Sequence, residues 1–188
     1  MTDTTGPEQR AKEDELLVIR CQLGERAAFD ELTERWHPPL WKYVRRQAGE
    51  DDAAKDVAQD VWLRVLRGIA RLRDGSRLRP WLFGIARRAL MDRLRHQYAA
   101  PSSTDLDVTE LAANSTVDSL EEEIGAMEDE LARLPATERE VLTLFYLREL
   151  SLAEVAEVLD VPVGTVKSRL FRARRLLRRG LDSEGTRT

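Results

Sequence analysis

The sequence predicts an all-α protein in which two small helical domains are joined by a flexible acidic linker. Two observations lead to this fold class: apolar residues recur at helical spacing through most of the chain, and no stretch longer than a few residues alternates as a strand would. A third observation divides the chain, because the composition changes abruptly near residue 99. The 188 residues suffice for one domain or two small ones, and 34% of them are charged.

Residues 1–12 are expected to be disordered, and residues 13–98 to form the first domain. A helix is predicted over residues 14–23, with an apolar stripe formed by Leu16, Leu17, Ile19 and Leu23. A second helix starts near Glu25, and His37-Pro38-Pro39 is expected to break or kink it, because proline lacks the N–H that a helix interior needs.

The remainder of this domain is expected to contain three more helices. One covers residues 40–48 and ends at Gly49; the strongest periodic helix follows over residues 51–69. The apolar face of this helix consists of Val57, Ala58, Val61, Trp62, Val65, Leu66 and Ile69. After a loop with several arginines, a helix over residues 81–98 starts beside Pro80. Its predicted core stripe is Leu82, Ile85, Ala86, Ala89, Leu90 and Leu94.

Residues 99–118 are small, polar and acidic, and are predicted to be the linker. Residues 119–180 form the second domain, and residues 181–188 a polar tail. Its first helix carries Leu120, Ile124, Met127 and Leu131 on one face. Thr137 is expected to cap the next helix, with Glu140 completing a capping box.

The most informative stretch, residues 151–179, is predicted to be two helices that meet at a tight turn. Ser151 opens the first helix with a capping box to Glu154, and Pro162 ends the turn that leads into the second. The uncovered face of the second helix carries Lys167, Ser168, Phe171, Arg172 and Arg175. No acid occurs between residues 161 and 181, whereas seven residues there are basic. This arrangement is typical of a helix that reads a DNA major groove; the alternative is a solvated basic helix at a chain end.

The formal net charge of −4 conceals a second basic block. Residues 71–95 contain eight arginines against two aspartates, whereas residues 101–140 contain twelve acids against two arginines. Affinity for phosphate depends on the local patch rather than on the total charge. Trp81 and Phe83 lie among these arginines, a combination that suits single-stranded nucleic acid, although both rings fit a core position equally well.

Several kinds of chemistry lack the residues they need. Cys21 is the single cysteine and fits a small core position; His37 and His96 match no metal-ligand spacing. There is no glycine-rich phosphate loop and no nucleophile elbow, so we expect neither an enzyme nor a bound cofactor or metal. No apolar run approaches a membrane span and the N-terminus is not a signal peptide, so we expect a cytoplasmic protein without membrane insertion.

Three motifs resemble those of a bacterial RNA polymerase sigma factor of the extracytoplasmic-function (ECF) type, within the sigma-70 family. DVAQDVWLRVLR is similar to the helix that binds the polymerase clamp, and LRPWLFGIARRALMDRLR to the helix that binds the −10 element. TEREVLTLFYLRELSLAEVAEVLDVPVGTVKSRLFRARRLLR resembles the helix-turn-helix domain throughout, and VGTVKSRLFRAR is its most specific part. The resemblance covers residues 14–98, as a sigma-2-like helical bundle, and residues 119–180, as a sigma-4-like domain.

The resemblance implies a protein that binds core RNA polymerase, through the clamp helices and flap of its large subunits, and directs transcription initiation at specific promoters. The implied polymerase contacts are Asp56, Gln59, Asp60, Leu63 and Arg64. The residues implied to bind the unpaired −10 strand are Arg77, Arg79, Trp81, Arg87 and Arg88. Those implied to read the −35 duplex are Thr165, Lys167, Ser168, Phe171, Arg172 and Arg175. An anti-sigma factor is a further expected partner.

The sequence departs from the family pattern at two positions. Arg88 stands where many members have Asn, so a base-specific amide contact there would be replaced by a phosphate contact. Asp160 stands where many have Gly, and Asp tolerates a left-handed turn better than most residues. Two alternatives remain: a stand-alone helix-turn-helix regulator that binds duplex DNA without polymerase, and an adaptor that binds only proteins.

Overall fold

The computed structural model describes residues 7–48, 50–99, 131 and 133–184. The chain divides into two compact units, Met1–Ala99 and Ala100–Thr188. All regular structure in these described ranges is helical, as predicted. The predicted linker at residues 99–118 and the predicted helix from residue 119 lie almost wholly outside the described residues.

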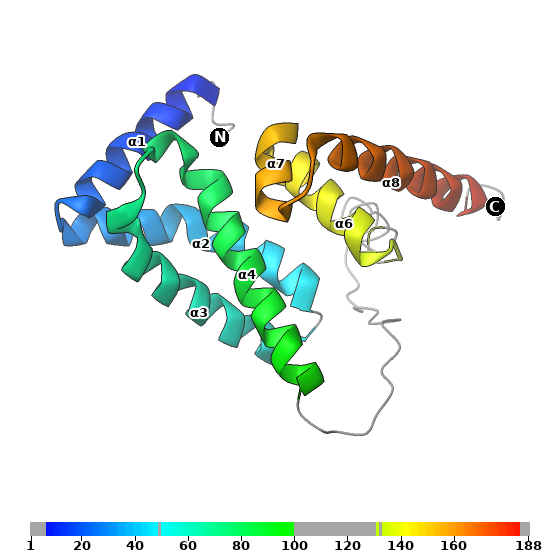
Figure 1. Cartoon of the computed structure of the whole chain (residues 1–188), viewed down its shortest axis with the longest axis horizontal. Coiled ribbons are helices and arrows are strands. Elements are labelled where there is room, and N and C mark those ends of the chain that lie inside the picture. The colour runs from blue at the N-terminus through cyan, green and yellow to red at the C-terminus, as the bar shows by residue number, and fades with distance from the viewer. Residues whose placement is uncertain (1–6, 49, 100–130, 132, 185–188) are drawn as a thin grey trace, which may run out of the picture. The chain divides into compact units, whose positions relative to one another are not determined.

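In the described residues of the first unit there are four α-helices: α1 (Pro7–Gln22), α2 (Arg26–Ala48), α3 (Asp51–Gly68) and α4 (Leu78–Ala99). Two short 3₁₀ turns, η1 (Ile69–Arg71) and η2 (Gly75–Arg77), lie between α3 and α4. Helices α2, α3 and α4 pack against one another in pairs, and α1 packs on α2 and on η2 (Figure 1).

The core of this unit is aromatic at its centre. The ring of Phe83 meets the edge of Tyr43 at a centroid distance of 5.4 Å and the edge of Trp36 at 6.5 Å. Phe83 is 1% exposed and Tyr43 is fully buried. Edge-to-face pairs add to the free energy gained by burying the rings themselves. Phe83 is therefore a core residue, which is one of the two positions that the sequence left open for this ring.

Helix α1 is longer than predicted and buries a different face. It begins at Pro7, so residues 7–12, which were expected to be disordered, are helical. Its buried residues are Asp14, Leu17, Val18 and Cys21, whereas Leu16, Ile19 and Leu23 are exposed. The exposed residues lie on the opposite side of the helix from the buried ones. Apolar residues therefore occur on both sides, and their spacing did not reveal which side packs.

Helix α2 continues through Pro38 and Pro39, so the predicted break does not occur. The prolines remove two N–H donors, but Pro38 is exposed on the outer side of the helix. Buried residues before and after them, Trp36 and Leu40, hold the two ends of α2 on the same core. The helix ends at Ala48; the expected capping role of Gly49 lies outside the described residues.

Two apolar residues of the predicted core stripes are exposed instead. Leu66 on α3 is 51% exposed and Leu94 on α4 is 39% exposed. Both sit at the margin of their stripe, toward the C-terminal end of a helix. The rest of these stripes is buried or half-buried, as the helical periodicity predicted.

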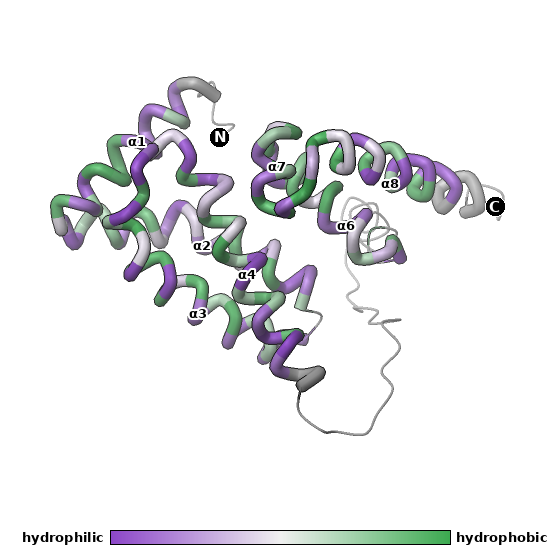
Figure 2. Tube along the Cα trace, in the orientation of Figure 1, coloured by the Kyte–Doolittle hydropathy of each residue, from purple (hydrophilic) through white to green (hydrophobic). Residues whose placement is uncertain are grey.

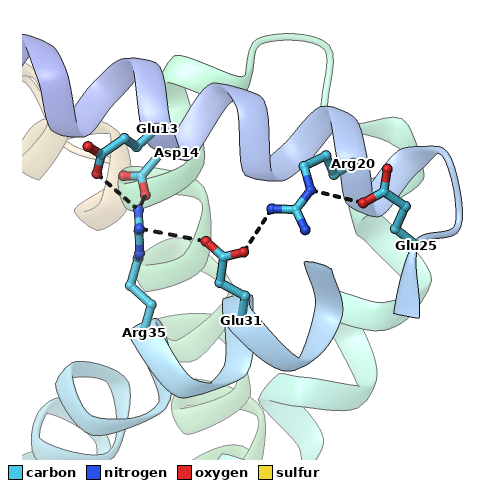
Figure 3. A network of polar contacts seen from close by, with 6 residues as sticks. All are labelled: Glu13, Asp14, Arg20, Glu25, Glu31 and Arg35. Carbon is cyan, nitrogen blue, oxygen red and sulfur yellow. Dashed lines mark hydrogen bonds and ion pairs between the residues drawn. The ribbon is translucent and has the colours of Figure 1, made fainter. Parts of the chain in front are cut away.

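A polar network ties α1 to α2 (Figure 3). Arg20 of α1 pairs with Glu31 of α2 at 2.8 Å and with Glu25 at 2.9 Å, and Arg35 of α2 pairs with the buried Asp14 at 3.3 Å. Burial raises the pKa of Asp14 above its ordinary value, and the hydrogen bond from Arg35 offsets only part of this effect. Arg35 therefore offsets part of the cost of burying the Asp14 carboxylate.

The second unit contains α6 (Ala136–Leu142), a π-helical turn η3 (Thr143–Leu147), α7 (Leu152–Leu159) and α8 (Val163–Glu184). The core residues are Val141, Leu144, Leu150, Val155, Leu159, Val166, Leu170 and Ala173. Figure 2 shows hydrophobic and hydrophilic residues alternating along α8. This pattern places one stripe of α8 on α6 and α7 and leaves the other in solvent.

The predicted capping box at Thr137 is wrong. The N-cap of helix α6 is Pro135, two residues earlier than predicted, and the Pro135 carbonyl accepts from the N–H groups of Glu138 and Arg139. The hydroxyl of Thr137 instead donates to the carboxylate of Glu138 at 2.6 Å. Glu138 and Glu140 are both buried.

Candidate nucleic-acid interface

The turn between α7 and α8 has the predicted geometry. The Ser151 hydroxyl accepts from the Glu154 N–H at 3.3 Å, and the Glu154 carboxylate accepts from the Ser151 N–H at 2.8 Å. Asp160 ends α7 in the left-handed conformation, with φ 52° and ψ 52°. The Pro162 carbonyl then accepts from Thr165 and Val166, which starts α8 at once. The two helices are thus joined by three residues.

The outward face of α8 carries the residues that were expected to read DNA. Lys167, Ser168, Phe171, Arg172 and Arg175 are exposed, and Thr165 is half-buried. Phe171 is 69% exposed, which is an unfavourable position for a large ring in a free protein. The Ser168 hydroxyl donates to the Thr165 carbonyl at 2.9 Å, and a hydroxyl oxygen that donates in this way can still accept from a further donor.

Arg172 has a second role that the sequence did not reveal. Its Nη1 donates to Oε1 of Glu138 at 3.0 Å, while the Glu138 side chain is 4% exposed and that of Arg172 60%. Burial raises the pKa of Glu138, but hydrogen bonds from Thr137 and Arg172 outweigh it, so the pKa lies below its ordinary value. Arg172 therefore joins α8 to α6 while part of its guanidinium faces solvent.

In the first unit, the candidate strand-binding residues lie on η2 and the first half of α4. Arg77 and Arg88 are exposed, while Arg79, Trp81 and Arg87 are half-buried. The guanidinium of Arg79 lies 5.9 Å from the centre of the Trp36 ring, so part of its charge faces the core aromatics. With Phe83 in the core, Trp81 is the remaining candidate for stacking a base among the residues singled out from the sequence.

Trp81 packs on the last residue of α3. A Cβ at Gly68 would lie 3.0 Å from Cζ2 of the Trp81 ring. A side chain at position 68 would therefore displace the ring. Arg88 folds back along its own helix, with Nη1 3.4 Å from the place that a Cβ of Gly84 would occupy.

The outer face of α3 is divided into a charged half and an apolar half. Asp60 pairs with Arg64 at 2.8 Å, Arg64 pairs with Asp92 of α4 at 2.8 Å, and Asp56 pairs with Arg93 at 3.2 Å. The hydrogen bond from Arg64 is the main reason that the pKa of Asp92 lies below its ordinary value. The pairs Arg64–Asp92 and Asp56–Arg93 join α3 to α4 along the charged half, whereas Asp60–Arg64 lies within α3.

The apolar half of this face was only partly predicted. Leu63 and Gln59 are exposed, and the Nε1–H of Trp62 donates to Nδ1 of His37 at 3.1 Å. The ring of His37 stacks between Trp62 and Trp41, with centroids 6.3 Å and 6.4 Å away. His37 and Trp41 are four residues apart on α2. Their proximity would have been predictable had α2 been recognised as continuous through its prolines.

The described residues contain no group of three or more His, Cys, Asp or Glu side chains that could hold a metal ion. Among the helices of these residues, none is both long and apolar enough to span a bilayer.

Comparison with known families defines the class of protein. Residues 32–99 match the family described as Sigma-70 region 2, and residues 124–177 match Sigma-70, region 4. The first match contains α3 and α4, and the second contains α6, α7 and most of α8.

Individual relatives show to which group of sigma-70 proteins the chain belongs. The chain is 32% identical to the ECF RNA polymerase sigma-E factor of Haemophilus influenzae, over 87% of this chain and 93% of that protein. It is 34% identical to the ECF RNA polymerase sigma factor SigM of Mycobacterium tuberculosis, over 89% of this chain and 84% of that protein. The chain therefore belongs to the ECF sigma factors of RNA polymerase.

A solved structure shares the fold. The sigma factor RpoE of Bartonella quintana, in complex with the anti-sigma factor NepR, matches with a TM-score of 0.65 at 24% identity. The match covers 82% of this chain and 96% of that one.

Proposed function

We propose that this sigma factor binds core RNA polymerase through the outer face of α3 and holds a promoter at two points. The first unit would bind the unpaired −10 strand, and α8 would read the −35 duplex. The observation that carries the proposal is the outward face of α8. It is exposed and acid-free through Leu181, and it follows a capped three-residue turn.

The residues proposed to contact the −35 element are of two chemical kinds. Lys167 and Arg175 are exposed and suited to phosphates, while Ser168 and Phe171 present a hydroxyl and an apolar ring to base edges. Arg172 would contribute the part of its guanidinium that Glu138 leaves in solvent. Replacing Arg172 by Ala would also leave Glu138 buried without its cation, so Lys167 and Phe171 are the cleaner positions for mutation.

The −10 contacts would use Trp81 for stacking and Arg77, Arg79, Arg87 and Arg88 for the strand. Unstacking a base costs a few kcal/mol, and stacking on an aromatic ring returns about 1–3 kcal/mol. Trp81 is held on Gly68, so the ring is already placed before a base arrives. Arg88 stands where many family members have Asn and would hold a phosphate.

Transcription from a purified system tests the proposal. The chain with core RNA polymerase should initiate at a matching promoter, and neither component alone should. Specific and equally tight duplex binding without polymerase, together with no transcript, would favour the stand-alone regulator.

Asp60→Arg tests the polymerase contact on α3. The Arg64–Asp92 pair survives this change, so the fold should remain intact while the affinity for core polymerase falls about tenfold or more. Glu34→Arg makes the same charge reversal on an exposed position of α2 and should leave that affinity unchanged. Normal association of the Asp60→Arg protein with polymerase would remove α3 from the proposed interface.

We further propose an anti-sigma factor as a regulatory partner and the cytoplasm, where polymerase works, as the place of action. The related RpoE is held by the anti-sigma factor NepR, and this supports the first part. Recovery of a single inhibitory protein that competes with core polymerase for the purified chain would test it.

A further inference from the structure

Helix α1 makes three separate contacts with the segment from Ile69 to Arg79, the loop that leads into the proposed −10 surface. The loop has little internal support: η1 and η2 are single 3₁₀ turns, and such short turns have poor hydrogen-bond geometry. Within the loop, Asp74 accepts from the Ser76 N–H at 3.0 Å, and its own carbonyl accepts from the Arg77 N–H at 3.1 Å.

The first contact is a side-chain cap at the end of α3. The Nε2 of Gln22 donates to the carbonyl of Ile69 at 3.0 Å and to the carbonyl of Leu72 at 2.8 Å. The Ile69 carbonyl also accepts from the Leu72 N–H at 3.1 Å, so Gln22 adds a second hydrogen bond to the one that closes η1. Gln22 uses both N–H groups of its amide on these two acceptors and so fixes the direction in which the chain leaves α3.

The second contact is backbone against backbone. Gly75 is buried, and a Cβ there would lie 2.8 Å from the Cα of Glu15 and 3.2 Å from its carbonyl oxygen. Only glycine allows the start of η2 to lie this close to α1.

The third contact is electrostatic. Asp14 of α1 is 3% exposed and interacts with the charge of Arg79 as well as pairing with Arg35. Arg35 also reaches Glu31, which Arg20 holds from α1 (Figure 3). Asp14 thereby links the end of the loop to the network that joins α1 and α2.

We propose that Gln22 is a positioning residue for promoter recognition: it holds the loop from Ile69 to Arg79 in the conformation that binds the unpaired −10 strand. This inference rests on the proposed function of that loop. Gln22 touches neither DNA nor polymerase in this role. Its effect passes through the carbonyls of Ile69 and Leu72 to Arg77, Arg79 and Trp81.

Gln22→Glu is the sharpest test, because a carboxylate has nearly the same shape but no N–H to donate to either carbonyl. Gln9→Glu is the matched control: it is the same change on the same helix, at an exposed side chain whose Nε2 donates to Glu13 at 3.3 Å. The assay would compare transcription, by the full-length protein with core polymerase, from promoters that differ at single −10 positions. We expect Gln22→Glu to lower discrimination between them about fivefold or more, the factor that one lost hydrogen bond carries. Affinity for core polymerase and selectivity among −35 sequences should not change.

Hydrogen exchange supplies a readout that does not depend on transcription. In the Gln22→Glu protein the amides of Leu72, Ser76 and Arg77 should exchange faster, whereas those of the Gln9→Glu protein should not. Wild-type exchange and wild-type −10 discrimination in the Gln22→Glu protein would overturn the inference. If the unmodified chain gives no polymerase-dependent transcript, the proposed function fails, and the exchange rates still decide whether Gln22 holds the loop.

Discussion

At the scale of single residues, Gly68 decides where the Trp81 ring lies. Its backbone φ of −103° suits any residue, so only the ring, 3.0 Å from a Cβ, opposes a side chain there. We expect Gly68→Ala to move the ring by a few tenths of an ångström and to lower transcription several-fold. Near-ultraviolet circular dichroism should show the movement of the ring. This spectral difference should be absent when Gly68→Ala is introduced into a protein that already carries Trp81→Phe.

Gly84→Ala is the control for that substitution. Its new Cβ would meet the flexible end of Arg88 at 3.4 Å, which is an ordinary contact. Alanine is favoured over glycine within a helix, so the free energy of unfolding should rise by up to about 1 kcal/mol. If the Gly68→Ala protein matches the Gly84→Ala protein in transcription and in near-ultraviolet circular dichroism, the role given to Gly68 is contradicted.

The ion pair between Glu138 and Arg172 predicts a pH dependence. The pKa of Glu138 is lowered in the folded state, so its contribution to stability is complete above its ordinary value of 4.5 and is lost as the pH falls through the lower folded-state pKa. Glu138→Gln should lower the free energy of unfolding by about 1 kcal/mol at pH 7. This is less than a fully buried ion pair would lose, because the Arg172 side chain is 60% exposed and its charge is screened by solvent. The difference from the wild type should shrink below pH 4.5, as measured by urea unfolding. A difference that is independent of pH would contradict the ionised pair.

At the scale of elements, α7 depends on its capping box. Ser151→Ala removes the hydroxyl that accepts from Glu154, and loss of such a cap costs about 1 kcal/mol. Thermal unfolding followed by far-ultraviolet circular dichroism should show this loss. Ser168→Ala, within α8, removes a hydroxyl that bonds only to its own helix and should change stability by less than about 0.5 kcal/mol.

Substitutions on the exposed face of α8 should distinguish contacts with DNA phosphates from contacts that recognise the base sequence. With reconstituted holoenzyme, Lys167→Ala should weaken binding to all −35 sequences alike and reduce the salt dependence of log K by about one. Phe171→Ala should leave the salt dependence unchanged and reduce discrimination among −35 sequences, because a ring carries no charge. Identical effects of the two substitutions would show that α8 does not divide its contacts in this way.

At the scale of the whole molecule, the two units should unfold separately, because each has its own core. All four tryptophans lie in the first unit, so their fluorescence reports on that unit alone, while circular dichroism follows both. Leu144 is fully buried in the second unit, and Leu144→Ala should cost about 2–5 kcal/mol there. The urea transition seen by circular dichroism should shift, and the tryptophan transition should not.

Leu82→Ala, which truncates an equally buried leucine of the first unit, is the reciprocal control. It should shift the tryptophan transition. A tryptophan transition that moves with Leu144→Ala would show that the units are energetically coupled.

The sequence by itself determined the parts of this protein that depend on local chemistry. Helical periodicity predicted most core stripes, Ser151 and Glu154 predicted the start of α7, and Asp160 predicted the left-handed turn. The segregation of basic residues predicted the exposed face of α8. These features could be read because a cap, a turn or a stripe involves residues only a few positions apart.

Only the tertiary structure decided the features that join distant segments. Phe83 is a core residue because it meets Trp36 and Tyr43, which lie 47 and 40 residues earlier in the chain. Arg172 is paired because α6 brings Glu138 to it, and Gln22 caps a turn 47 residues away. Helix α2 continues through two prolines because residues on both sides of them share one core. In each case the free energy comes from packing or hydrogen bonding between elements, and no local pattern in the sequence reports it.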